Sequence, residues 1–265
     1  MPLTDDDFEV LGSLRGMRVF AETIRNIVND SSRDNDSFED KFKEALDAQV
    51  LSRDTKVIDK RLREAYLFGC PASLERFEVT PDRGITQDRI DRLATCEWIN
   101  HGQDLIIVGA TGTGKSYLAK ALGVAACRSK LTARYYRLNE LADDFDTVAA
   151  SPTGRKQLLE ELTRPTLLII DDFLATDVST NALTQVFNLL VARENASTVI
   201  ASQHEPDYWY DVFHDEAIAD AVLSRLANNG TKLTITGQDM RERQDLQEER
   251  RTFIKKQRTK QSRKR

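Results

Sequence analysis

The segment GATGTGKS, residues 109–116, has the residue types and the spacing that bind the phosphates of a nucleotide. It satisfies the pattern G-x-x-x-x-G-K-[ST], the P-loop or Walker A motif, whose glycines let backbone N–H groups point at a phosphate. Lys115 is placed to contact the β- and γ-phosphate oxygens, and the Ser116 hydroxyl to ligate Mg²⁺. The motif therefore predicts a nucleoside triphosphate site. Its residues are Gly109, Ala110, Thr111, Gly112, Thr113, Gly114, Lys115, Ser116 and Tyr117.

Two adjacent acids, Asp171 and Asp172, end the apolar run LLII about fifty residues after the P-loop. An apolar strand that ends in an acid at this distance is typical of a Walker B motif, which brings a carboxylate to the Mg²⁺ shell. We predict that Asp171 serves the metal and that Asp172 polarises the attacking water; the alternative is a pair of solvated loop acids. Aspartate is shorter than glutamate, so its carboxylate reaches less far, and a misplaced catalytic group slows the reaction. The aspartate at position 172 therefore also predicts slow intrinsic hydrolysis of ATP.

Three further polar residues lie later in the chain. Ser202 and Gln203 follow the strand-like segment STVIA, where a side chain could orient water against the γ-phosphate; capping the next helix is the alternative for either residue. Arg225 stands among small and apolar residues in AIADAVLSRLANNG. Such an arginine is either a buried ion-pair partner or a finger that reaches the nucleotide site of a neighbouring subunit.

The elements that must position these residues form an α/β pattern from about residue 104. Short apolar segments at 105–108, 133–138, 166–171, 197–202 and 231–236 alternate with helical segments. Their near-continuous Val, Ile and Leu content predicts a five-stranded parallel sheet that is flanked by helices on both faces. We place this α/β domain at residues 77–240.

Residues 1–76 are rich in charge and predict a small all-helical domain. The stretch 11–28 is amphipathic, residues 29–37 form a loop, and a long helix follows from Phe38 to Leu67. Four cations of the long helix share one face, because they are three or four residues apart. That face is either an ordinary solvated surface or a stripe that follows nucleic-acid phosphates without reading bases. The four are Arg53, Lys56, Lys60 and Arg63.

Composition adds two constraints. The chain has 265 residues and 40% hydrophobic content, which is enough for a sizeable core. The net charge of -5 hides an asymmetry, because the last sixteen residues hold nine Lys or Arg and no acid. These residues end a basic tail, which we delimit as 241–265 and which is either a solvated end or a flexible arm that adds phosphate contacts.

Cysteine spacing and hydropathy exclude two further classes of protein. Cys70, Cys96 and Cys127 are widely spaced, so we expect packed, reduced thiols and neither a disulfide nor structural zinc. We find no apolar run long enough to span a membrane, and the acidic start MPLTDDDFEV is unlike a signal peptide. We therefore expect a cytosolic protein without membrane contact.

The motifs in this order resemble a known family. They are GATGTGKS, LLIIDDF, IASQ, VLSRL and GQDMR, preceded by LRGM at 14–17 and SLERFEV at 73–79. This set is similar to that of the IstB-type helper ATPases of bacterial insertion sequences, relatives of the DnaC helicase loaders within the AAA+ ATPases. The resemblance covers nearly the whole chain and makes the N-terminal helices a DNA-binding or partner domain.

The resemblance implies an AAA+ ATPase without a C-terminal lid domain that uses ATP and Mg²⁺. Such an ATPase oligomerises on double-stranded DNA and delivers a DDE transposase of IstA type, in the bacterial cytoplasm and at the nucleoid when it is bound to DNA. Lys115 and Ser116 carry over as Walker A, and Asp171 and Asp172 as Walker B. The remaining matches are Gln203 or Ser202 as sensor 1, Arg225 as an arginine finger acting in trans, and Arg241 as the arginine after the last strand.

Two positions depart from the family pattern. Asp239 stands where the family often has Ser, and Gln203 where relatives often have Asn. A DnaC-like replicative helicase loader is the alternative function; it would contact a helicase through its N-terminal domain and prefer single-stranded DNA. A small-molecule P-loop kinase is a third class, but it should carry an arginine-rich lid that the sequence lacks.

Overall fold

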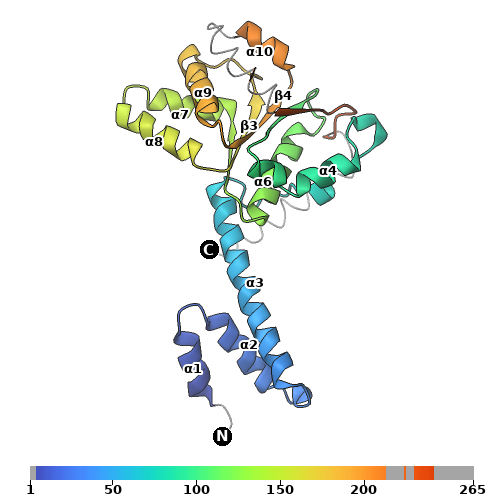
Figure 1. Cartoon of the computed structure of the whole chain (residues 1–265), viewed down its shortest axis with the longest axis vertical. Helices are drawn as coiled ribbons and strands as arrows, with labels where there is room; N and C mark the ends of the chain where they lie inside the picture. Colours follow the sequence, from blue (N-terminus) through green and yellow to red (C-terminus); the bar gives the residue numbers. More distant parts are fainter. Residues whose placement is uncertain (1–3, 213–223, 225–229, 242–265) are drawn as a thin grey trace. The chain divides into compact units, whose positions relative to one another are not determined.

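The structure is a computed structural model that describes residues 4–212, 224 and 230–241 (Figure 1). The chain forms two compact units, which divide between Lys60 and Arg61. The division falls earlier than the boundary that we placed after residue 76, because Ala65, Leu67 and Leu74 are buried in the core of the second unit.

The first unit is helical. It contains α1 (Asp5–Ser13), α2 (Arg18–Val28), η1 (Ser31–Arg33) and most of α3 (Phe38–Glu64). The stretch 11–28 is therefore not one helix: the chain turns before α2, where Gly16 has a φ of 83°. The helices of this unit pack around a small hydrophobic core, which consists of Phe8, Phe20, Ile24 and Ala45.

The second unit is built on a parallel sheet. Its strands are β1 (Asp104–Val108), β2 (Ala133–Arg137), β3 (Leu167–Phe173), β4 (Ser197–Ser202) and β5 (Gly230–Thr234), in the order β2-β3-β4-β1-β5. All four neighbouring pairs are parallel, so the predicted five-stranded parallel sheet is confirmed. Because parallel strands share a direction, their carboxyl ends meet at one edge of the sheet.

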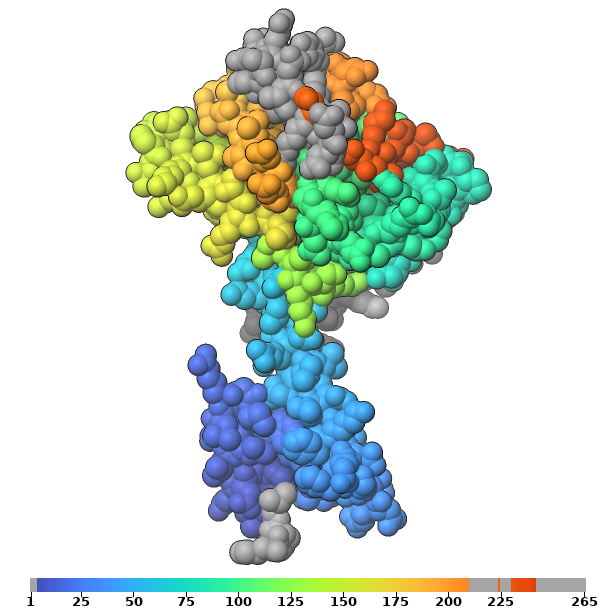
Figure 2. Space-filling model, in the orientation of Figure 1, coloured from blue at the N-terminus to red at the C-terminus, as the bar shows by residue number. Residues whose placement is uncertain are grey.

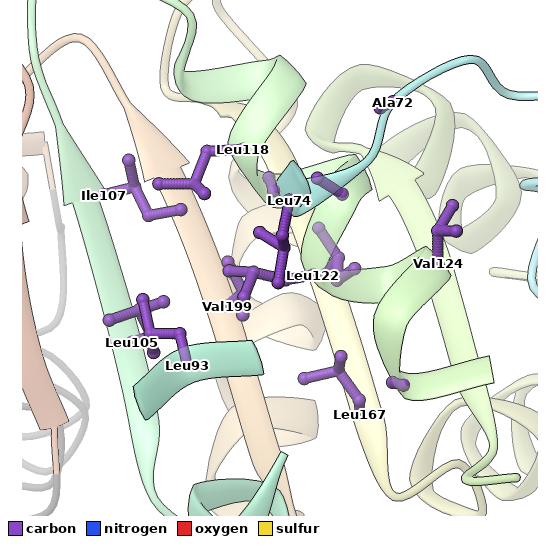
Figure 3. Close-up of a cluster of buried hydrophobic side chains, with 14 of the residues drawn as sticks. Ala72, Leu74, Leu93, Leu105, Ile107, Leu118, Leu122, Val124, Leu167 and Val199 are labelled. Carbon is purple, nitrogen blue, oxygen red and sulfur yellow. The ribbon is translucent and has the colours of Figure 1, made fainter. Parts of the chain in front are cut away.

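Helices cover both faces of this sheet (Figure 1). On one face, Leu105, Ile107 and Val199 of the strands pack with Leu118 and Leu122 of α6 (Figure 3). Alternate strand residues enter a second core on the other face. The first face carries α4 (Gln87–Ala94), α5 (Glu97–Asn100) and α6 (Lys115–Arg128), and the second α7 (Leu138–Thr147), α8 (Pro152–Thr163) and α9 (Thr180–Ala192).

Shorter elements complete the second unit. The segment before the sheet contains η2 (Leu74–Arg76) and η3 (Pro81–Arg83), and α10 (Pro206–Val212) follows β4. Within the described part of the chain, no helix is long and apolar enough to cross a membrane. The three cysteines are free, and burial raises the pKa of the Cys127 thiol to about 11, which keeps it protonated and unreactive.

One buried arginine joins the loops at the amino-terminal edge of the sheet. Arg193 is 1% exposed, and its Nη1 donates to the carbonyls of Leu162 and Pro165 at 2.7 and 3.0 Å. Its Nη2 donates to the Ser197 carbonyl at 2.8 Å. The side chain therefore ties the ends of α8 and α9 to the strands that follow them.

We expect Arg193→Met to destabilise the protein, because it leaves several buried carbonyls without a donor. The free energy of unfolding should fall by at least about 3 kcal/mol in chemical denaturation. Arg164→Met, at an exposed arginine of the same region, is the control and should change it by less than about 0.5 kcal/mol. Equal losses in the two variants would contradict the role given to Arg193.

Candidate nucleotide-binding site

The P-loop joins β1 to α6 and depends on glycine where other backbone comes close. A Cβ on Gly109 would lie 2.2 Å from the Ile235 carbonyl oxygen, on the chain that leaves β5. Gly112 has a φ of 86°, which favours glycine, and Met240 N donates to its carbonyl at 2.9 Å. The loop is therefore held from one side by the segment that follows the last strand.

Lys115 begins α6 and lies over the loop. Its Nζ donates to the Ala110 carbonyl at 2.8 Å. Burial lowers the pKa of Lys115, while Asp171 and Asp172 act in the opposite direction. The ammonium thus lies against the P-loop, next to the backbone that we expect to bind phosphate.

Ser116 and Asp171, the two residues predicted to serve the metal, touch each other. The Ser116 hydroxyl donates to Asp171 Oδ1 at 2.9 Å, and Asp171 is only 1% exposed at the carboxyl end of β3. Hydroxyl and carboxylate oxygens are the ligands that Mg²⁺ prefers, together with phosphate and water. The residues present therefore fit the ion. The described residues hold no group of three or more His, Cys, Asp or Glu that could bind a metal without the nucleotide.

Tyr135, which sequence reasoning missed, completes the surroundings of Asp171. Its hydroxyl donates to Asp171 Oδ2 at 2.7 Å, and Asp172 N donates to Oδ1 at 2.9 Å. Burial, followed by the Asp171 charge, raises the pKa of Tyr135, so the phenol stays protonated and keeps donating. No motif marks this residue in the sequence, because its role depends on β2 lying next to β3.

Asp172 has a different environment from Asp171. Its backbone adopts a left-handed φ of 52°, and its side chain is 52% exposed. Burial and the neighbouring Asp171 charge raise the pKa of Asp172, whereas Arg137 lowers it. Arg137, at the end of β2, has its Nε 3.7 Å from Asp172 Oδ2. One aspartate is therefore enclosed by donors, and the other is held at the surface by an arginine.

The structure separates the two candidates at the end of β4. The Ser202 hydroxyl is buried, donates to the Phe173 carbonyl at 2.9 Å and accepts from His204 N at 3.0 Å. Gln203 instead accepts, through Oε1, from the Thr111 hydroxyl of the P-loop at 3.1 Å. Gln203 is thus the residue that contacts the nucleotide loop, while Ser202 ties β4 to β3.

The segment before β1 holds the P-loop from another side. Arg83 is 4% exposed; its Nη2 donates to the Thr113 carbonyl at 2.6 Å, and its guanidinium lies 4.4 Å from the centre of the Phe77 ring. Thr236 N donates to the Arg83 carbonyl at 3.1 Å, and Figure 2 shows the red segment after β5 against the teal segment that contains Arg83. Sequence reasoning missed Arg83 because nothing local marks it.

The remaining predicted site residues fall into three groups. Arg241 is described; it is bound to Asp239 next to the P-loop. Arg225 and the basic residues 242–265 lie outside the described residues. The four cations of the predicted stripe are exposed on α3, and they are Arg53, Lys56, Lys60 and Arg63.

Comparison with known proteins places this site in a family. The family model of IstB-like ATP binding proteins matches residues 11–248. The insertion sequence ATP-binding protein y4uH of Sinorhizobium fredii is 31% identical over 227 residues, 85% of this chain and 91% of that protein. The ATP-binding protein of insertion sequence IS21 from Pseudomonas aeruginosa is 26% identical over 236 residues, 89% of this chain and 88% of its own length.

Solved structures resemble part of this chain. AMPPCP-bound DnaA from Aquifex aeolicus superposes with a TM-score of 0.52 and 18% identity over 65% of this chain and 52% of its own. DnaI gives a TM-score of 0.51 and 17% identity over 64% of this chain and 90% of its own. At these identities the likeness shows the fold alone. The predicted fold class, a P-loop NTPase of AAA+ type with an N-terminal helical region, is confirmed.

Tyr135→Phe tests the contact to Asp171. Because the variant leaves Asp171 with one donor fewer in a buried position, we expect binding of Mg²⁺ with ATP to weaken roughly three- to tenfold. Binding of ATP in the presence of EDTA should change little. Tyr136→Phe, on the next residue of β2 and in the opposite core, is the matched control. If both variants lose the same affinity, the effect belongs to strand packing and not to Asp171.

Proposed function

Because the chain belongs to the family of IstB-like ATP binding proteins, we propose that it is an ATPase that assembles on double-stranded DNA and recruits or regulates a transposase. The transposase would be the DDE enzyme of IstA type from the same insertion sequence. One observation supports this most: in a chain of this family, Ser116 and Asp171 meet at 2.9 Å beside the P-loop lysine. ATP would act as the switch for assembly and not as a metabolic substrate.

The proposed chemistry is hydrolysis of ATP to ADP and phosphate. The P-loop N–H groups and Lys115 bind the phosphates, and Ser116 and Asp171 would hold Mg²⁺, which neutralises phosphate charge when it is bound. Asp172 polarises the attacking water as its general base. Gln203, which contacts the loop through Thr111, is the residue that orients this water. Arg241 acts on the γ-phosphate from the segment after β5.

Slow intrinsic hydrolysis is part of the proposal. Asp172 is shorter than the glutamate that would extend further toward the water, and Arg137 lies 3.7 Å from its carboxylate. A carboxylate that reaches less far and is paired with a cation accepts a proton poorly until that cation moves away. The ATP-bound assembly would therefore persist until DNA or the transposase stimulates hydrolysis, which resets it.

Assembly needs contacts between subunits. Arg225, outside the described residues, is our candidate for a finger that enters the ATP site of a neighbouring copy. ATP would then favour the oligomer, because its γ-phosphate supplies the negative charge that attracts the arginine. The protein would work in the bacterial cytoplasm, associated with the nucleoid when it is bound to DNA.

The DNA surface is proposed to include the cationic stripe of α3. Exposed Lys and Arg side chains at helical pitch can contact consecutive phosphates and give affinity without base specificity. The basic tail would add further phosphate contacts. Both features predict binding that weakens steeply as salt rises.

Sedimentation with ATP and duplex DNA tests the assembly. We expect large complexes that need both ligands, and Lys115→Ala should abolish them by removing the charge that binds the phosphates. Asp172→Asn, which impairs only hydrolysis, should retain them. Monomers under all conditions would contradict the proposal. A preference for single-stranded over duplex DNA in a competition assay would favour the helicase-loader function instead.

A salt titration tests the stripe. Each neutralised phosphate contributes about one unit to the slope of log K against log salt, so Lys56→Gln or Lys60→Gln should lower the slope by about one. Lys43→Gln, an exposed lysine on another face of α3, should leave the slope unchanged. If all three variants behave alike, the stripe is only a solvated surface.

A further inference from the structure

The carboxylate of Asp239 lies directly on the P-loop. A Cβ added to Gly112 would be 2.1 Å from Asp239 Cγ and 2.2 and 2.3 Å from its two oxygens. The next residue fixes this placement, because Met240 N donates to the Gly112 carbonyl at 2.9 Å. A negative group thus occupies the space next to a loop whose N–H groups are arranged to bind anions.

Arg241 pairs with this carboxylate. Its Nε donates to Asp239 Oδ1 at 3.1 Å and its Nη2 to Oδ2 at 3.0 Å, while its backbone N donates to Oδ1 at 2.9 Å. These hydrogen bonds lower the pKa of Asp239, so the acid is ionised near neutral pH. The arginine side chain is still 60% exposed and is able to turn toward another anion.

The pair has an electrostatic consequence for the nucleotide. ATP brings several negative charges to the P-loop, and a carboxylate beside Gly112 repels them. While Arg241 stays on Asp239, the two charges nearly cancel. If Arg241 leaves to contact a phosphate, it uncovers the carboxylate, and the gain from the new contact is reduced by the repulsion that appears.

We propose that Asp239 is an internal competitor of the nucleotide: it retains Arg241 and holds a negative charge at the P-loop, and so weakens nucleotide binding and speeds release. Asp239 is therefore a residue that sets nucleotide affinity, and it does not itself bind the nucleotide. The inference rests on the P-loop site of the proposed function, but not on DNA or transposase binding.

Asp239→Asn in the full chain removes the charge and keeps the shape. We expect fluorescent ATP and ADP analogues to dissociate more slowly in stopped flow, and their Kd to fall roughly three- to tenfold. Asp88→Asn is the matched control, because Asp88 pairs with Arg92 at 3.0 Å in an exposed ion pair of α4. A Kd for Asp239→Asn that rises or equals that of the control would overturn the proposal.

A double-variant cycle with Arg241→Ala separates competition from positioning. If Asp239 competes, adding Asp239→Asn to Arg241→Ala restores part of the lost affinity, since the uncovered charge is removed. If Asp239 only positions Arg241, its substitution has no effect once the arginine is gone, and the proposal fails. Thermal unfolding without nucleotide checks that each variant folds, and Asp239→Ser is used if the asparagine variant does not.

Failure of this inference differs from failure of the proposed function. Lys115→Ala that binds nucleotide as well as the parent protein would show that the P-loop is not the site, whatever Asp239 does. Loss of binding in Lys115→Ala together with an unchanged Kd in Asp239→Asn would keep the site and reject only the competitor.

Discussion

The buried charge of Asp171 is the constraint on which the nucleotide site depends. A carboxylate that is 1% exposed at a strand end costs free energy unless donors surround it. Ser116 from α6, Tyr135 from β2 and the backbone of Asp172 supply those donors at 2.7–2.9 Å. The hydrogen bonds to this one carboxylate therefore tie together the first turn of α6, the neighbouring strands β2 and β3, and the backbone of Asp172.

The P-loop itself is held by chain segments that are far apart in sequence. Arg83 reaches Thr113 from before β1, and the segment after β5 contacts Gly109 and Gly112. A loop that is fixed at several carbonyls keeps its N–H groups directed at one place, which lowers the cost of ordering the loop when an anion binds. The glycines are needed as much for these close approaches as for the phosphate.

The sequence predicted what local patterns encode, and missed what depends on strand order. Runs such as LLIIDDF and STVIAS have enough apolar length to identify strands, and GATGTGKS identifies its own loop. The contacts of Tyr135 and Arg137 with the two aspartates follow from β2 being paired with β3, which no sequence pattern encodes. The sequence places Gln203 and Ser202 together at the end of one strand, and only the folded chain shows that Gln203 contacts Thr111 of the P-loop. The turn before α2, where Gly16 has a positive φ, lies within the stretch 11–28 that the sequence marks only as amphipathic.

Two aspartate–arginine pairs lie around the nucleotide site. Their shared chemistry suggests how nucleotide binding is controlled. Arg137 approaches Asp172 at 3.7 Å, and Arg241 is hydrogen-bonded to Asp239. In both pairs, the arginine that an incoming phosphate would attract is already paired with an aspartate. Such pairs are exposed, so each is weak and exchangeable. If the proposed nucleotide site is correct, a phosphate that displaces each acid would make nucleotide binding an exchange of arginine partners.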